Sequence, residues 1–100
     1  MTTQPQFTPE QAIDLDHGTR DIPQDAARCE DIGGPVARWI AADGAEISAR
    51  AQSDGMIRVG IALFEGSYSA VYGYAWTGAE AAVLVKRAIA GQGAGQIFRA

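Results

Sequence analysis

The sequence lacks disulfide bonds, because it contains a single cysteine, Cys29. Small secreted domains usually depend on several such bonds, so the chain does not fit that class. No apolar run reaches the roughly 20 residues that a membrane-spanning helix needs. The first six residues contain neither a basic region nor an apolar stretch, so they predict no signal peptide. We therefore expect a cytoplasmic protein with no membrane partner.

Basic residues are also scarce, and the acidic residues are concentrated in one half of the chain. Eight Lys and Arg against twelve Asp and Glu give a net charge of −4. Residues 1–55 carry ten acidic and four basic side chains, whereas residues 56–100 carry two acidic and four basic ones. An acidic surface repels nucleic-acid phosphates and attracts basic protein surfaces. We therefore expect no direct nucleic-acid binding and a protein partner with a basic surface, contacted by Asp14, Asp16, Asp21, Asp25, Glu30 and Asp31.

Residues that could carry catalysis are few and poorly arranged. On a helix, Asp14 and Asp16 would point about 200° apart, so these two carboxylates and His17 do not predict a metal site. Nothing around Cys29 resembles the sequence signature of a catalytic cysteine. The glycines between 91 and 95 follow a predicted helix, whereas a phosphate-binding loop precedes one. We predict neither an enzyme nor a bound metal or cofactor.

The length and composition are those of one globular domain. The chain has 100 residues, of which 47% are hydrophobic and 20% charged, and these values are ordinary for a folded domain. We predict a flexible N-terminus over residues 1–7 and a single α+β domain over residues 8–91. A glycine-rich connector and a short C-terminal segment are expected over residues 92–100.

A short helix is predicted near the N-terminus. Thr8 is a suitable N-cap, Pro9 suits the first helical position, and Gln11 suits a capping box. The helix is expected to end near His17, with Gly18 in the left-handed conformation that ends many helices. It has few large apolar residues, so we expect it to dock weakly.

A second short helix is predicted over residues 23–32, with Asp21 as its N-cap. Ala26, Ala27 and Cys29 are its candidates for burial. The sequence Gly33-Gly34-Pro35 is expected to end it.

Three turn signals at regular spacing divide the central region: Asp43-Gly44, Ser53-Asp54-Gly55 and Glu65-Gly66-Ser67. An Asp-Gly pair between alternating runs is typical of a β-hairpin, because both residues tolerate positive φ. The first of the flanking runs could also form a helix, since Pro35 suits a first helical position. The pattern predicts an antiparallel meander of three to four strands, over residues 36–42, 45–52, 56–64 and 68–76.

A longer helix is predicted over residues 78–90. Thr77 and Glu80 form a capping box directly after the last strand. Ala81, Leu84 and Val85 begin an apolar stripe with helical spacing. We expect this helix to pack on one face of the meander.

Aromatic side chains alternate along the last strand. Tyr68, Tyr72, Tyr74 and Trp76 are predicted to share one face, and Trp39 from the first strand could join them. These rings form either the core or a recognition surface, since tyrosine and tryptophan are favoured in binding hot spots. The sheet is expected to have two apolar faces, of which one helix covers only one. We therefore predict a partner protein or a homodimer on the other face.

These observations favour a non-enzymatic, acidic protein–protein interaction module. Small acidic domains without catalytic motifs are common among phage and mobile-element inhibitors of host defence, including anti-CRISPR proteins, and composition alone suggests this analogy. Two other hypotheses stay open. One is a small-molecule binder or minor enzyme, with Arg58, Tyr72 and Glu80 converging in a pocket between sheet and helix. The other is a dimeric structural subunit.

Overall fold

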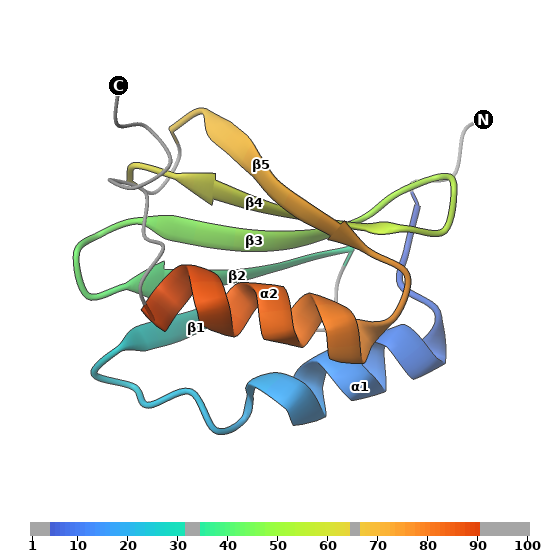
Figure 1. The fold of residues 1–100 in the computed structure, drawn as a ribbon, viewed down its shortest axis with the longest axis horizontal. Helices are drawn as coiled ribbons and strands as arrows, with labels where there is room; N and C mark the ends of the chain where they lie inside the picture. Colours follow the sequence, from blue (N-terminus) through green and yellow to red (C-terminus); the bar gives the residue numbers. More distant parts are fainter. Residues whose placement is uncertain (1–4, 32–34, 65–66, 91–100) are drawn as a thin grey trace.

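The computed structural model describes residues 5–31, 35–64 and 67–90. The described residues form an α+β fold, with one helix before and one helix after a five-stranded antiparallel sheet (Figure 1). This confirms the predicted fold class. The elements are α1 (Pro9–Thr19), β1 (Ala27–Asp31), β2 (Val36–Ala41), β3 (Glu46–Ala51), β4 (Ile57–Ala62), β5 (Ser69–Ala75) and α2 (Gly78–Ala90).

The sheet is a meander in which each strand pairs with the next one along the chain, in the order β1-β2-β3-β4-β5. The four predicted strands are confirmed, and the ambiguous first run forms strand β2 and not a helix. Two hairpin turns have the positive φ that the Asp-Gly signals predict at glycine, 90° at Gly44 and 89° at Gly55, but among the described residues Asp43 and Asp54 do not have positive φ. The predicted connector over residues 92–100 lies outside the described residues, as do residues 1–4 and the central part of the Glu65-Gly66 turn.

The prediction of a second N-terminal helix over residues 23–32 is wrong. Residues Ala27–Asp31 form strand β1, which pairs antiparallel with β2. A helix here would have buried only small side chains, and Glu30 and Asp31 near its end would have opposed the helix dipole. As a strand, the same residues satisfy the backbone groups along the edge of β2, a gain that local sequence patterns do not reveal.

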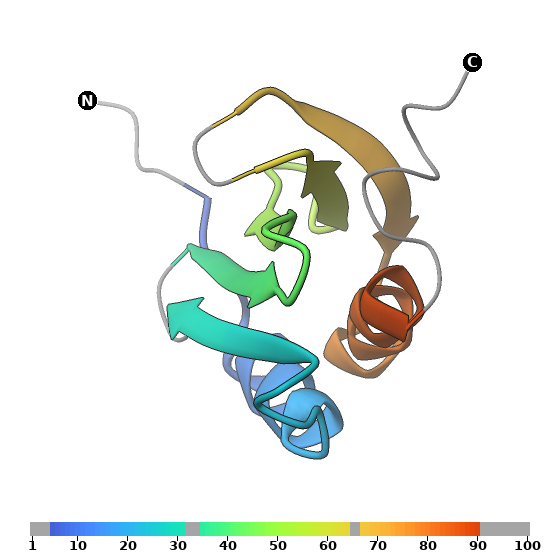
Figure 2. The ribbon, with the colours of Figure 1, turned by 90° about the vertical axis from the view of Figure 1, so that its left-hand side faces the viewer.

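Both helices lie on the same side of the sheet, so the hydrophobic core lies between one layer of helices and one face of the sheet. Helix α2 packs against β3, β4 and β5, and α1 packs beside α2; Figure 2 shows the sheet curving around the pair. The largest fully buried side chains are Trp39, Leu15, Ile47, Ile57, Ile61, Val59 and Val85.

The predicted second apolar face of the sheet does not exist. Ile57, Val59 and Ile61 are fully buried beneath the helices, and Leu63, which follows β4, is 48% exposed. The opposite face mixes charged and polar residues with apolar ones such as Val36, Ile40 and Val71. The homodimer was predicted from an uncovered apolar face, and that reason no longer holds. The homodimer itself stays a prediction, which sedimentation velocity will test.

Helix α1 docks closely, contrary to the prediction of weak docking. It extends to Thr19, so Gly18 lies inside the helix and not in a left-handed cap. A Cβ atom on Gly18 would lie 2.5 Å from the Cβ of Ala82, and one on Gly78 would overlap the Gln11 carbonyl oxygen. Glycine at these two positions lets the helix backbones approach one another.

Candidate interaction surfaces

The outward side of α1 combines acidic residues with an exposed apolar residue. The predicted capping box is present: the Gln11 amide donates to the Thr8 hydroxyl, and the Thr8 amide donates to the Gln11 side chain. Four exposed residues follow with the i, i+3, i+4, i+7 spacing of one helix face, and we call them the α1 outer face. They are Glu10, Ile13, Asp14 and His17.

Ile13 lies within this face and is 55% exposed. Glu10 and Asp14 make no ion pair with any other residue in the described part of the chain. The face therefore presents two carboxylates without a partner beside an exposed aliphatic side chain.

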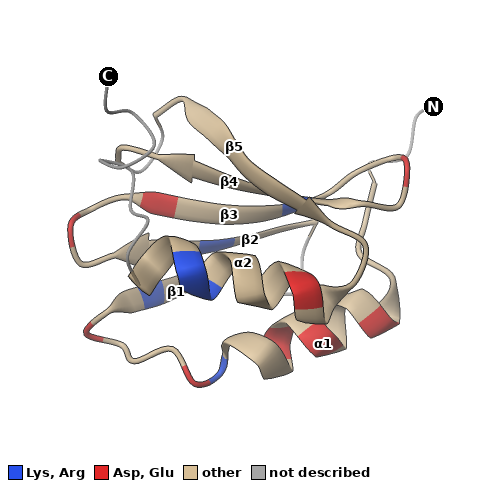
Figure 3. Ribbon diagram, in the orientation of Figure 1, with Lys and Arg blue, Asp and Glu red and all other residues tan. Residues whose placement is uncertain are grey.

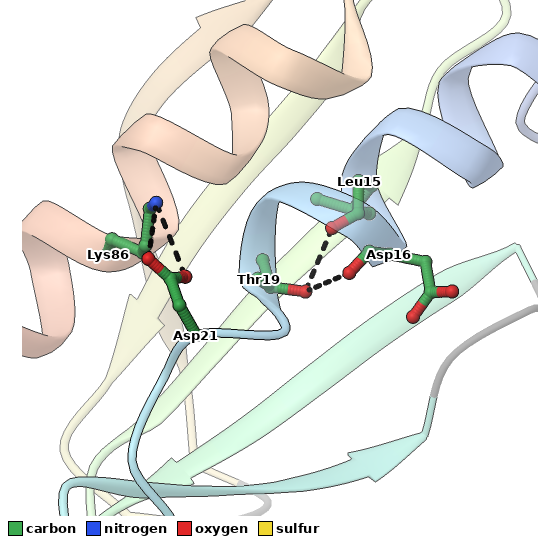
Figure 4. A network of polar contacts seen from close by, with 5 residues as sticks. All are labelled: Leu15, Asp16, Thr19, Asp21 and Lys86. Atoms are coloured by element: carbon green, nitrogen blue, oxygen red, sulfur yellow. Dashed lines mark hydrogen bonds and ion pairs between the residues drawn. The ribbon is translucent and has the colours of Figure 1, made fainter.

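Two other predicted contact residues already have basic partners within the molecule. Asp16 pairs with Arg20 one turn further along α1, at 2.8 Å, and Asp21 pairs with Lys86 of α2, at 3.3 Å. Figure 4 shows the second pair joining the segment after α1 to α2. Exposed ion pairs of this kind contribute little to stability, but they lower the negative charge offered to a partner.

The remaining predicted acidic residues lie at or near β1. Asp25 is exposed in the segment before the strand. Glu30 accepts a hydrogen bond from Arg28 at 2.7 Å, so its charge is also compensated. Asp31 ends the strand, and its side chain lies outside the described residues. The six predicted acidic residues are thus spread over α1, a loop and β1, and three of them are paired internally.

The predicted aromatic face of the last strand is wrong, because β5 contains a β-bulge. Val59 pairs with Gly73 and Gly60 pairs with Val71, so Tyr72 is an extra residue without a position in the register. A bulge breaks the strict alternation of side chains. The aromatic residues before and after it therefore do not form one ladder.

Each aromatic side chain has its own environment. Tyr72 packs against the core, and Trp39 is buried within it, at 2% exposure. Tyr74 lies opposite Arg58 in the strand register. Half of its surface is exposed, and it lines a hollow with Glu80, Val83, Leu84 and Arg87 of α2. Tyr68 is almost fully exposed, whereas Trp76 follows β5 and reaches over Gly55.

Sequence reasoning missed a group of arginines on the sheet face opposite the helices, which we call the open face. The strand register places these residues in three rows that run across the sheet. The first row contains Val36, Arg50, Arg58 and Tyr74, the second Asp31, Arg38, Ser48, Gly60 and Val71, and the third Arg28, Ile40, Glu46, Ala62 and Ser69.

Four of the eight basic residues of the chain therefore lie on this one face. In Figure 3, blue segments occur on the strands and on α2, and most of the red segments lie on α1 and the loops. The open face thus carries an arginine group, and α1 carries several of the acidic residues. Each of these arginines lies at an outward position of a strand whose side chains alternate between the two faces. This alternation is the sequence signal from which their common face could have been predicted.

The arginines of the open face differ in how well they are paired. Arg38 lies 3.5 Å from the Glu46 carboxylate. Arg58 donates to the Ser69 hydroxyl at 3.3 Å and to its carbonyl oxygen at 3.4 Å. Arg50 makes no ion pair within the described residues, although it lies directly opposite Arg58.

The predicted pocket of Arg58, Tyr72 and Glu80 is not formed. Arg58 lies on the open face, whereas Glu80 accepts a hydrogen bond from the Thr77 hydroxyl at the start of α2, at 3.1 Å. The Glu80 amide in turn donates to the Thr77 hydroxyl, also at 3.1 Å, so Thr77 caps the helix as predicted. The Glu80 carboxylate accepts from the Thr77 hydroxyl and not from the backbone amide that the predicted capping box requires.

A hollow of about 430 Å³ lies beside the edge of β1, and its lining mixes charged and apolar side chains. Across the described residues, no three His, Cys, Asp or Glu side chains are grouped so that they could hold a metal ion. Neither of the two described helices is long and apolar enough to span a bilayer. The hollow is lined by Asp16, Thr19, Arg20, Ile22, Gln24, Ala27, Arg28, Cys29 and Trp39.

A comparison with protein-family models finds no match, and neither do comparisons with curated proteins and with solved structures. We therefore infer function from the α1 outer face and the open face themselves.

Proposed function

We propose that this chain is a non-enzymatic protein-interaction module that binds a basic protein surface through the α1 outer face. The observation that carries the proposal is Ile13, an exposed aliphatic side chain between the uncompensated carboxylates of Glu10 and Asp14. Binding hot spots commonly combine a desolvated anchor with a polar rim. Ile13 would supply the anchor and the two carboxylates the rim.

The charge distribution supports the same proposal. Carboxylates at the rim of an interface speed association with a basic partner and help to exclude acidic ones. Asp25 extends the negative charge beyond α1, since it is exposed and also makes no ion pair within the described residues. The Asp16 and Asp21 carboxylates contribute less, because Arg20 and Lys86 compensate them.

More specifically, the chain would be a cytoplasmic inhibitor of a host defence complex, acting as anti-CRISPR proteins do. Such an inhibitor would occupy the basic surface on which its target binds nucleic acid. The small size and the net charge of −4 support this form.

The test is affinity capture of the tagged chain from its native host, with nuclease present to remove nucleic-acid bridges. Each captured protein is then purified and titrated with the wild type, with Ile13→Ala and with Asp14→Lys. Val83→Ala is the matched control, because Val83 is also an exposed aliphatic residue on a helix, at 45% exposure. We expect both α1 variants to weaken binding about tenfold or more and the control to bind like the wild type.

Two results would contradict the proposal. One is a captured partner whose affinity is the same for the wild type and both α1 variants. The other is a reproducible and saturable thermal shift with a metabolite or nucleotide, which would favour a small-molecule binder.

A further inference from the structure

We infer that the open face of the sheet is a second docking surface, for an acidic protein segment, centred on Arg38, Arg50 and Arg58. This inference is independent of the proposed function, because it uses the opposite side of the molecule. It would make the chain a two-sided module, with a basic partner on α1 and an acidic one on the sheet.

Arg50 and Arg58 lie directly opposite one another on neighbouring strands. The two residues are cross-strand partners in the β3–β4 register. Opposite positions bring Cβ atoms to within about 5 Å, and like charges placed there destabilise a sheet. Arg50 makes no ion pair within the described residues and lines a hollow with Pro35, Val36 and Arg38, so its charge is available to an external carboxylate.

The three guanidinium groups are arranged around one small residue. Ser48 lies opposite Arg38 on one side and Gly60 on the other, and Arg50 is two residues further along the same strand. A Cβ atom on Gly60 would lie 2.9 Å from Arg58 Nη1 and 3.4 Å from Ser48 Oγ. The Arg58 side chain therefore lies across Gly60, so its guanidinium group occupies the centre of the face.

The residues around this centre resemble those of a protein interface. Val71 and Tyr74 on β5 are each about half exposed, at 45% and 50%. Arginine and tyrosine are enriched in binding hot spots, and the fork of an arginine side chain suits bidentate carboxylate binding. The open face thus offers both charge complementarity and apolar contact to an acidic segment.

A protein segment fits this face better than a nucleic acid does. Glu46 lies within the third row and pairs with Arg38, and Glu30 compensates Arg28 at the β1 edge. Interspersed carboxylates repel a continuous phosphate backbone. They are tolerated in a protein interface, where charges of both signs can be matched individually.

The test uses a fluorescently labelled peptide in which glutamates alternate with leucine and serine, titrated with the full chain at low salt. The key variant is Arg50→Ala combined with Arg58→Ala. The matched control is Arg20→Ala combined with Lys86→Ala, which removes the same charge from positions outside the open face, where the two residues pair with Asp16 and Asp21. We expect the key variant to weaken binding about tenfold or more and the control to lose much less.

A further variant, Arg50→Glu, separates binding from folding. The introduced carboxylate would face Arg58 as an opposite charge and so preserve the sheet, yet it would repel an acidic peptide. The inference predicts a folded protein that no longer binds the peptide. It would be overturned by wild-type affinity in this variant, by equal losses in the key and control variants, or by no measurable binding of the peptide to the wild type. Displacement of the peptide by a single-stranded oligonucleotide that binds more tightly through the same arginines would also overturn it, in favour of a nucleic-acid surface.

Discussion

The side-chain amide of Gln11 donates a hydrogen bond to the carbonyl oxygen of Trp76, at 3.0 Å. It donates a second one to the carbonyl oxygen of Gly55, also at 3.0 Å, while its own oxygen accepts from the Thr8 amide. One side chain thus joins the start of α1 to the β3–β4 turn and to the junction between β5 and α2. The α1 outer face begins at this point, so Gln11 helps to set its position relative to the sheet.

Replacing Gln11 with glutamate should therefore destabilise the protein. The carboxylate keeps the acceptor for Thr8 but turns two donated hydrogen bonds into repulsion between oxygens. Leaving such groups unpaired costs about 1–3 kcal/mol, and the partial exposure of Gln11 favours the lower end. Urea denaturation measures the change, with Thr8→Ala as a control that removes only the cap, at a cost of about 1 kcal/mol. Equal stability of Gln11→Glu and the wild type would contradict this role.

Substitution of Gly78 by alanine should also destabilise the protein, against the usual trend. In a helix, alanine is normally more favourable than glycine by about 0.5–1 kcal/mol. Here the added Cβ would overlap the Gln11 carbonyl oxygen and crowd the Leu15 amide nitrogen at 2.7 Å. Overpacking of this kind costs about 1–3 kcal/mol. Thermal denaturation of Gly78→Ala checks the sign, and an increased melting temperature would show that the helices do not meet at this glycine.

The docking of α1 can be tested with two aliphatic residues of the same helix. Leu15 is 1% exposed, whereas Ile13 is 55% exposed. Leu15→Ala should lower the free energy of unfolding by about 2–5 kcal/mol, and Ile13→Ala should change it by less than about 0.5 kcal/mol. Chemical denaturation of both variants measures the difference. Similar small effects for the two would support the weak docking that the sequence predicts.

Local signals in the sequence predicted most of the elements correctly. Caps such as Thr8 and Thr77 and turns such as Asp43-Gly44 depend on hydrogen bonds and dihedral angles within a few residues, so the sequence contains the relevant information. Strand β1 was missed because its stability comes from pairing with β2. The close approach of α1 to α2 was missed because Gly18 and Gly78 act through contacts distant in the sequence.

The candidate surfaces also depend on contacts between residues distant in the sequence, so local signals predicted them only in part. Alternation correctly placed Arg50 on the side opposite Ile47 and Ala49, but its position beside Arg58 depends on the strand register. The bulge at Tyr72 has no clear sequence signal, and it disrupts the aromatic ladder that regular alternation predicts. The outward Ile13 could have been recognised from its position between Glu10, Asp14 and His17 on one helix face.

The opposition of Arg50 and Arg58 leads to a stability prediction that is separate from binding. Arg50→Glu replaces a like-charge pair with an opposite-charge pair, and such cross-strand pairs contribute about 0.2–1 kcal/mol. Because Arg50 is exposed, solvent screening should keep the gain near the lower end of that range. Urea denaturation at low salt should therefore show a small increase in stability, which declines as salt is added. Arg87→Glu is the matched control, since it makes the same charge change on α2, away from the open face. An equal gain in the control would assign the effect to net charge, and a loss of stability in Arg50→Glu would show that the two guanidinium groups do not repel each other.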